Sequence, residues 1–150
     1  MGTINSLGSE RAAVVAVVDP DALGTGAATS AYVSMSDFNQ VVAIVQAGAL
    51  GTSATLDFKL VQATDSSGTS SKDITDKSIT QFVKATNDDD QAIVNCRSDE
   101  LDVANGFDYV AMTITIGTAT SYASCIMLGV TPRYAPASDN ALASVQEIVS

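Results

Sequence analysis

The chain has 150 residues, of which 46% are hydrophobic and only 16% charged, so it can bury a core large enough to fold as one domain without a metal or a disulfide. It carries 17 acidic against 7 basic side chains, and the resulting net charge of −10 excludes the Lys/Arg surface that nucleic acid requires and disfavours anionic membranes as a partner. There is no histidine, which removes histidine triads, histidine metal ligands and the usual general base near neutral pH.

The N-terminal third predicts an arm followed by strands. Residues 1–11 are polar and contain glycine, as expected for a flexible arm. Residues 12–18 form a continuous run rich in valine, which we interpret as a strand covered on both faces. A signal peptide is the weaker interpretation, because Asp19 and Pro20 close the run where a small-residue cleavage site would stand. Residues 38–47 predict another strand, with a lone central helix as the alternative.

The middle of the chain contains the clearest strand pattern. Leu56, Phe58 and Leu60 alternate with polar residues, as in an antiparallel strand with one buried face. Residues 64–72 contain no apolar side chain and predict a long exposed connection or finger. Further strands are predicted at residues 79–83, 92–96, 107–116 and 122–130.

The C-terminal segment, residues 137–150, changes period. Asp139 could cap a short helix with Leu142, Val145 and Val149 on one stripe, and an extended arm is the alternative. About eight short strands without alternating helices predict an all-β fold. We therefore expect one antiparallel β-sandwich, jelly-roll-like, over residues 1–150, with arms at 1–11 and 137–150.

Cys96 and Cys125 each lie within a predicted strand. No CxxC or other metal-ligand spacing is present. Two small buried thiols are the favoured interpretation, and an inter-strand disulfide is the alternative.

Acidic groupings at residues 88–90, at 99–102 and at Asp19 with Asp21 could in principle bind a cation. None has the ligand offsets and glycine turn of a calcium loop, so solvated surface is the favoured interpretation and no metal is expected. A sugar hydrolase is disfavoured because the chain has no tryptophan and few other aromatic residues. The sequence predicts neither a catalytic residue nor a cofactor.

Contact with a partner is the function that the composition favours. Arg133 and Tyr134 belong to the residue types enriched at interface hot spots, although a plain strand-end charge is the alternative for Arg133. The arms supply the other candidate interface residues, which are Ile4, Leu7, Leu142 and Val145.

Several segments resemble small virion proteins of tailed bacteriophages, in particular capsid decoration (cement) proteins. The similar segments are residues 16–35, 38–45, 56–64, 98–110 and 133–135, within a span of roughly 14–136. The shared patterns are strands and turns rather than catalytic signatures, so no functional residue is transferred individually.

The resemblance implies a non-enzymatic virion protein on the outer surface of a capsid, assembled in the host cytoplasm. Its partners would be the major capsid protein and copies of itself, with an arm adding strand hydrogen bonds to a neighbour. A tail-tube, tail-terminator or head–tail joining protein is the alternative. A carbohydrate-binding or adhesive module fits less well, because exposed aromatic residues are scarce.

Overall fold

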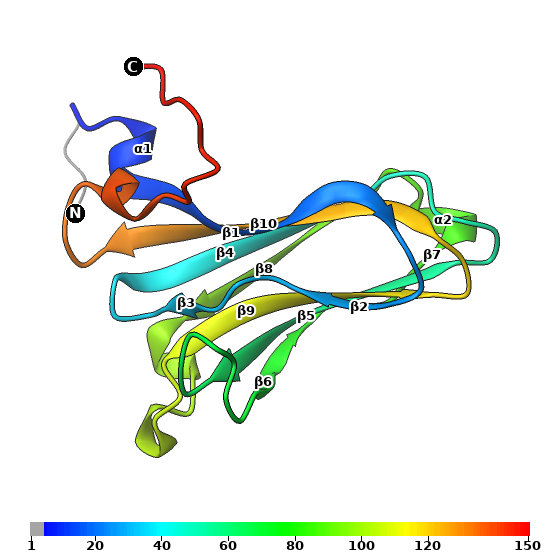
Figure 1. Cartoon of the computed structure of the whole chain (residues 1–150), viewed down its shortest axis with the longest axis horizontal. Helices are drawn as coiled ribbons and strands as arrows, with labels where there is room; N and C mark the ends of the chain where they lie inside the picture. Colours follow the sequence, from blue (N-terminus) through cyan, green and yellow to red (C-terminus); the bar gives the residue numbers. More distant parts are fainter. Residues whose placement is uncertain (1–4) are drawn as a thin grey trace.

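In the computed structural model of the chain, residues 5–150 are described. They form two antiparallel sheets packed face to face (Figure 1). The first sheet has the strand order β1 (Ala12–Leu23), β10 (Ser121–Pro132), β4 (Phe38–Ala47) and β8 (Gln91–Arg97). The second has the order β2 (Gly26–Thr29), β9 (Tyr109–Gly117), β5 (Thr55–Ala63) and β6 (Lys72–Ser78), with β3 (Val33–Ser34) on β9 and β7 (Phe82–Val83) on β5.

Only short helical turns interrupt the strands of the described chain. They are α1 (Gly8–Arg11), α2 (Lys84–Asn87), η1 (Ser98–Glu100), η2 (Val103–Asn105) and η3 (Ala137–Asn140). The all-β prediction is confirmed.

The pairing of the eight long strands is that of a jelly roll. Taken in chain order, the first strand pairs with the eighth, the second with the seventh, the third with the sixth and the fourth with the fifth, all antiparallel. The chain therefore resembles one long hairpin that has been wrapped so that successive pairs enter opposite sheets. Two further pairings, β10 with β4 and β9 with β5, join these pairs into the two sheets.

The core lies between the sheets and follows the alternation in the sequence. Val110, Met112, Ile114 and Ile116 of β9 are all at most 2% exposed. Leu56, Phe58 and Leu60 of β5 lie opposite the same row of residues and are equally buried. These large apolar residues occupy every second position, and this period makes the two strands predictable from sequence.

Two terminal features differ from the sequence prediction, and one predicted strand is confirmed over its helical alternative. Strand β1 continues through Asp19 and Pro20 to Leu23, because register shifts at residues 14–16 and 18–21 let the strand bend while still pairing with β10. Residues 38–47 are strand β4, which excludes the central helix. The helix predicted after Asp139 is absent: η3 ends at Asn140, and the chain continues to Ser150 without regular structure.

Strands β2 and β6 were not predicted. Strand β6 has one buried residue, Ile74, and is otherwise polar, because it lies at a sheet edge with its outer side in solvent. The strand predicted at residues 79–83 is shorter than expected, since only β7 pairs there. Residues 64–71 do form an exposed connection, folded around Asp65, whose carboxylate accepts hydrogen bonds from the backbone of Ser67 (2.9 Å) and Thr69 (3.1 Å).

Gly129 lies on the core face of β10, directly against an aromatic ring. A Cβ at this position would lie 2.6 Å from Cε2 of Phe38, a side chain that is itself 1% exposed. The ring occupies the space that any side chain at Gly129 would need, so the close packing of β10 on β4 depends on glycine here.

We expect Gly129→Ala to lower the free energy of unfolding by about 1–3 kcal/mol, because the added methyl group overpacks a filled core. Chemical denaturation with a spectroscopic readout measures the change. Gly24→Ala is the matched control, since nothing lies within 4 Å of a Cβ at Gly24. Equal stabilities of the two variants would contradict the packing described for Phe38.

The two cysteines lie on opposite sides of β4. Cys96 of β8 pairs with Val41, and Cys125 of β10 pairs with Val45. Their Cα atoms are separated by two strand spacings, about 9–10 Å, and by a further offset along β4. A disulfide needs Cα atoms within about 7 Å of each other, so the two cysteines cannot form one. Both are free and buried, and loss of hydration raises the pKa of each thiol to about 11. The interpretation as two buried thiols is confirmed.

We expect neither thiol to react with a thiol reagent at neutral pH while the chain is folded, because both are buried and protonated. Two thiols should react once the chain is unfolded in denaturant without a reductant. A titration that finds fewer than two thiols in the unfolded, unreduced protein would contradict the free state of the cysteines.

Candidate functional site

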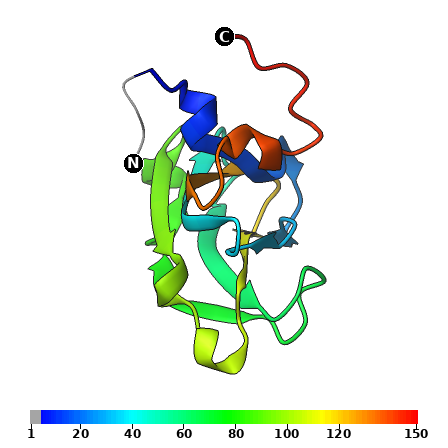
Figure 2. The ribbon, with the colours of Figure 1, turned by 90° about the vertical axis from the view of Figure 1, so that its left-hand side faces the viewer.

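The two terminal segments meet at one end of the sandwich (Figures 1 and 2). Helix α1 and the 3₁₀ turn η3 pack against each other and against the end of β1. Within η3, Ala137 is fully buried. Beyond it, the N–H of Leu142 donates to the carbonyl of Val14 on β1 (2.9 Å), and the chain then leaves the body of the molecule. We call this region, made of residues 5–11 and 133–150, the terminal end.

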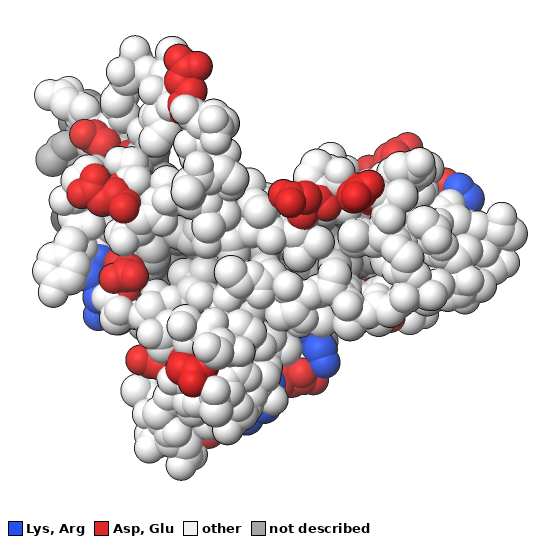
Figure 3. All heavy atoms as spheres, viewed as in Figure 1, with Lys and Arg blue, Asp and Glu red and all other residues white. Residues whose placement is uncertain are grey.

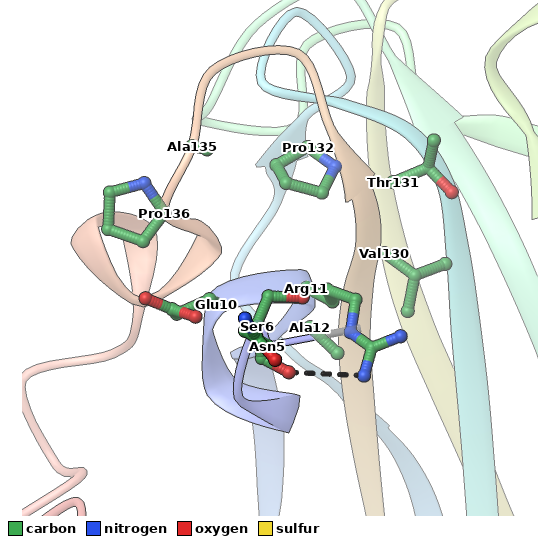
Figure 4. A pocket seen from close by; sticks show the side chains of 10 residues that line it. All are labelled: Asn5, Ser6, Glu10, Arg11, Ala12, Val130, Thr131, Pro132, Ala135 and Pro136. Atoms are coloured by element: carbon green, nitrogen blue, oxygen red, sulfur yellow. Dashed lines mark hydrogen bonds between the residues drawn. The ribbon is translucent and has the colours of Figure 1, made fainter. Parts of the chain in front are cut away.

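A hollow of about 890 Å³ opens at the terminal end between α1 and the segment that follows β10 (Figure 4). Val130 and Ala12 belong to the strands that line it, and Pro132 and Pro136 border it on the side of η3. The guanidinium of Arg11 donates to the carbonyl of Ser6 (3.2 Å). The lining is mixed: Ala12, Val130, Ala135 and two prolines supply an apolar part, and Asn5, Ser6, Glu10, Arg11 and Thr131 supply polar groups. Such a lining suits an extended peptide segment, whose side chains and backbone are apolar and polar in turn.

Arg133 and Tyr134 lie in the link between β10 and η3. The backbone N–H of Arg133 donates to the carbonyl of Asp37 (2.9 Å), and its guanidinium reaches Ser98 Oγ (3.3 Å). Arg133 therefore fixes the end of β10 to neighbouring loops, which is the structural role that the sequence left open as the alternative. Tyr134 is 78% exposed and its ring projects from the link.

The structure places the predicted interface residues together. Leu7 is 48% exposed, and Leu142 and Val145 are partly buried, all within the terminal end. Ile4 lies outside the described residues. Residues from opposite ends of the sequence thus form one surface, which the sequence alone could not show. Their role as an interface stays a prediction.

The acidic groupings do not converge on a common point. Asp99 pairs with Arg97 (3.0 Å), Glu100 with Lys77 (2.9 Å) and Asp102 with Lys72. Within residues 5–150 no group of three or more potential metal-ligating side chains comes together. On the face drawn in Figure 3 the carboxylates are scattered in separate places.

Two of these carboxylates, those of Asp88 and Glu100, accept hydrogen bonds that hold loops in place. The pKa of Asp88 is lowered by the hydrogen bond from Lys84 and by the N–H of Leu50, which donates to it (3.0 Å). The N–H of Arg97 and the ammonium of Lys77 lower the pKa of Glu100 in the same way. These groups anchor loops in their ionised form, the opposite of what a general acid requires.

A further surface, which sequence reasoning missed, is the outer side of the sheet β1–β10–β4–β8. Val14, Leu128 and Val42 stand side by side across three strands. The next row is Val17, Ile126, Ile44 and Ile93, two residues along β10 and β4 but three along β1, where the register shifts between Val14 and Ala16. We call these seven residues the aliphatic face.

The aliphatic face is open at its edge strand. Ile93 is 62% exposed, and the six other members are partly buried, in part by one another. The sequence contained a signal for it. Ile126 and Leu128 alternate with Cys125 and Met127, so β10 is apolar on both sides and one side had to face away from the core.

Across residues 5–150 the structure contains no helix long and apolar enough to cross a membrane.

Comparison with known proteins yields no relative in sequence. No family model matches the chain. No curated protein matches it either. Two solved structures are similar in fold, an empty virus-like particle of cowpea mosaic virus (TM-score 0.40, 11% identity, 89% of this chain and 90% of that chain) and naturally occurring empty particles of the same virus (TM-score 0.35, 12% identity, 87% and 94%). Similarities this weak assign neither a family nor a function to the chain.

Proposed function

We propose that this chain is a non-enzymatic structural protein of a virion, which decorates and stabilises a bacteriophage capsid by binding across major capsid protein subunits. The observation that carries the proposal is the terminal end. It exposes side chains that an isolated soluble protein gains nothing by exposing, Tyr134 at 78% and Leu7 at 48%, and Val149 of the departing C-terminal segment is 84% exposed. Exposed apolar side chains that gather in one place mark an interaction surface.

The backbone at this end also offers hydrogen bonds to a partner. Strand β1 is the edge of its sheet, and its N-terminal half receives one hydrogen bond from outside, from Leu142 to Val14. An extended segment of a capsid subunit can add to such an edge, with main-chain bonds providing affinity and the neighbouring hollow accepting side chains. On a shell that repeats one site many times, modest contacts of this kind suffice.

The charge of the chain agrees with an outer position. Packaged DNA would be repelled by a net charge of −10, whereas the outer surface of a shell does not touch it. The jelly-roll topology adds a rigid frame for such contacts, although the same fold also occurs in lectins and cupins and does not by itself determine function.

The test uses capsids of the phage whose genome encodes the chain, prepared without this protein. We expect the purified chain to bind them, and Tyr134→Ala to weaken binding about tenfold or more, because an exposed tyrosine at a hot spot contributes at least this much. Co-sedimentation with capsids, or titration followed by electron microscopy, measures the affinity.

Tyr122→Ala is the matched control. Tyr122 is 60% exposed on β10, but near the opposite end of that strand, so its loss should leave capsid binding unchanged. Absence of binding by the unmodified chain would refute the proposed function. Equal affinities of the two tyrosine variants would refute the terminal end as the contact surface.

A further inference from the structure

We propose that the aliphatic face is a self-association surface, on which a second copy of this chain docks with its own aliphatic face. The aliphatic face adjoins the terminal end, because Ala12 and Val130, which pair next to Val14 and Leu128, line the hollow there. The proposal itself does not depend on the proposed function.

Charge is the first argument. The chain carries 17 acidic side chains, yet none of the seven members of the aliphatic face is charged. On β4 and β8 the face is bordered by amides: Asn95 completes the row of Val42, and the rows on either side contain Gln40 next to Arg97 and Gln46 next to Gln91. Two copies of a protein with a charge of −10 repel each other over most of their surfaces, and here that repulsion is weakest.

The chemistry of the face also fits a copy of itself. Aliphatic side chains pack against aliphatic side chains, and a border of amides can donate to and accept from an identical border. A partner rich in charge would leave its charged groups buried and unpaired against Ile44 and Ile126, at a high desolvation cost. An isologous interface, in which both copies use the same surface, requires this kind of self-complementarity.

The charges at the two ends of the face select one orientation. Asp21 and Asp89 line a hollow together with Tyr122 and Ser124, so one end of the face is acidic. The other end holds Arg97, which is paired with Asp99. Stacking with parallel strands would bring the acidic ends of both copies together. In the alternative, the two-fold axis lies between the two sheets and runs perpendicular to the strands, midway between the two aliphatic rows. The strands of the two copies are then antiparallel, each aliphatic row packs on the other row of the second copy, and the acidic ends lie far apart.

Size sets the strength of the contact. Four strands spaced about 4.8 Å apart, over about five rows of outward residues, give a surface of roughly 500 Å² per copy. A standard stable interface buries about 800 Å² per partner, so the dimer should be weak and should form at high protein concentration. Such a contact matters where copies are held close together.

The experiment is analytical ultracentrifugation of the full chain from about 10 μM to about 1 mM, the range in which an interface below standard size dissociates. We expect a monomer–dimer equilibrium for the unmodified chain. Ile93→Lys should raise the dimer dissociation constant at least about tenfold, because it places a charge in the contact. The side chain is 62% exposed, so folding should be unaffected.

Val103→Lys is the matched control, because Val103 is 59% exposed in η2, away from the aliphatic face. It should associate as the unmodified chain does, and so should Tyr134→Ala. A chain that stays monomeric over the whole range, or a dimer that Ile93→Lys leaves intact, would overturn the proposal. If the unmodified chain is monomeric and Ile93→Lys instead loses capsid binding, the face binds the shell and the second copy is excluded.

The orientation has its own test. With the two-fold axis across the strands, β8 lies over β8, and the single variant Ile93→Cys should cross-link to itself with a bismaleimide that spans about 10 Å, the distance between packed sheets. The native thiols are buried and should not react. In the parallel arrangement β8 lies over β1, and cross-linking would require a second cysteine introduced at Val17. Efficient cross-linking only in that double variant would overturn the proposed orientation.

Discussion

Two antiparallel sheets face each other across a core of small and aliphatic side chains, and the contact between β10 and β4 holds the arrangement together. These two strands are the centre of the first sheet, and the ring of Phe38 on β4 fills the space next to Gly129 of β10 where a side chain would be. Because the start of β1 pairs with the end of β10, both terminal segments are held at the same end of the sandwich. The surfaces discussed above follow from that geometry.

The surfaces differ in what they offer a partner. The terminal end combines exposed side chains with the edge strand β1, whose Val14 carbonyl already accepts a hydrogen bond from Leu142, and we propose an extended segment of another protein as its partner. The aliphatic face is broad, nearly uncharged and complementary to itself. The carboxylates elsewhere hold loops in place through Lys84, Lys77 and Lys72, and the rest of the acidic surface discourages nonspecific contact. The two proposals assign the shell to the terminal end and a neighbouring copy to the aliphatic face.

The sequence predicted those parts of the fold in which burial imposes a period. Strand β5 alternates between core and exterior as far as Leu60, and β9 alternates between large apolar residues and the smaller Ala111 and Thr113, although those two are also buried. Strand β6 escaped notice because its one buried residue, Ile74, leaves no pattern. The helix expected after Asp139 does not form, because the N–H of Leu142 donates to the carbonyl of Val14 on β1 instead. Sequence patterns do not show such a contact between residues far apart in the chain.

The candidate surfaces were predictable only in part, for the same reason. Arg133, Tyr134 and the residues of the arms could be named from their chemistry, but their meeting at one end depends on the pairing of the first strand with the last. The aliphatic face could not be assigned from the sequence, because β10 is apolar on both sides and the pattern does not show which side faces the core. Only the structure shows that the side bearing Cys125 and Met127 faces the core. On that side Gly129 leaves the space that the ring of Phe38 fills.

The measurement that tests the account most directly is an electron cryomicroscopy map of the phage capsid with this chain bound. The account predicts density for the sandwich at boundaries between major capsid protein subunits, with the terminal end against the shell and the tips of the sandwich near Asp89 directed away from it. A saturated capsid without such density, or a sandwich bound with its terminal end directed outward, would contradict it.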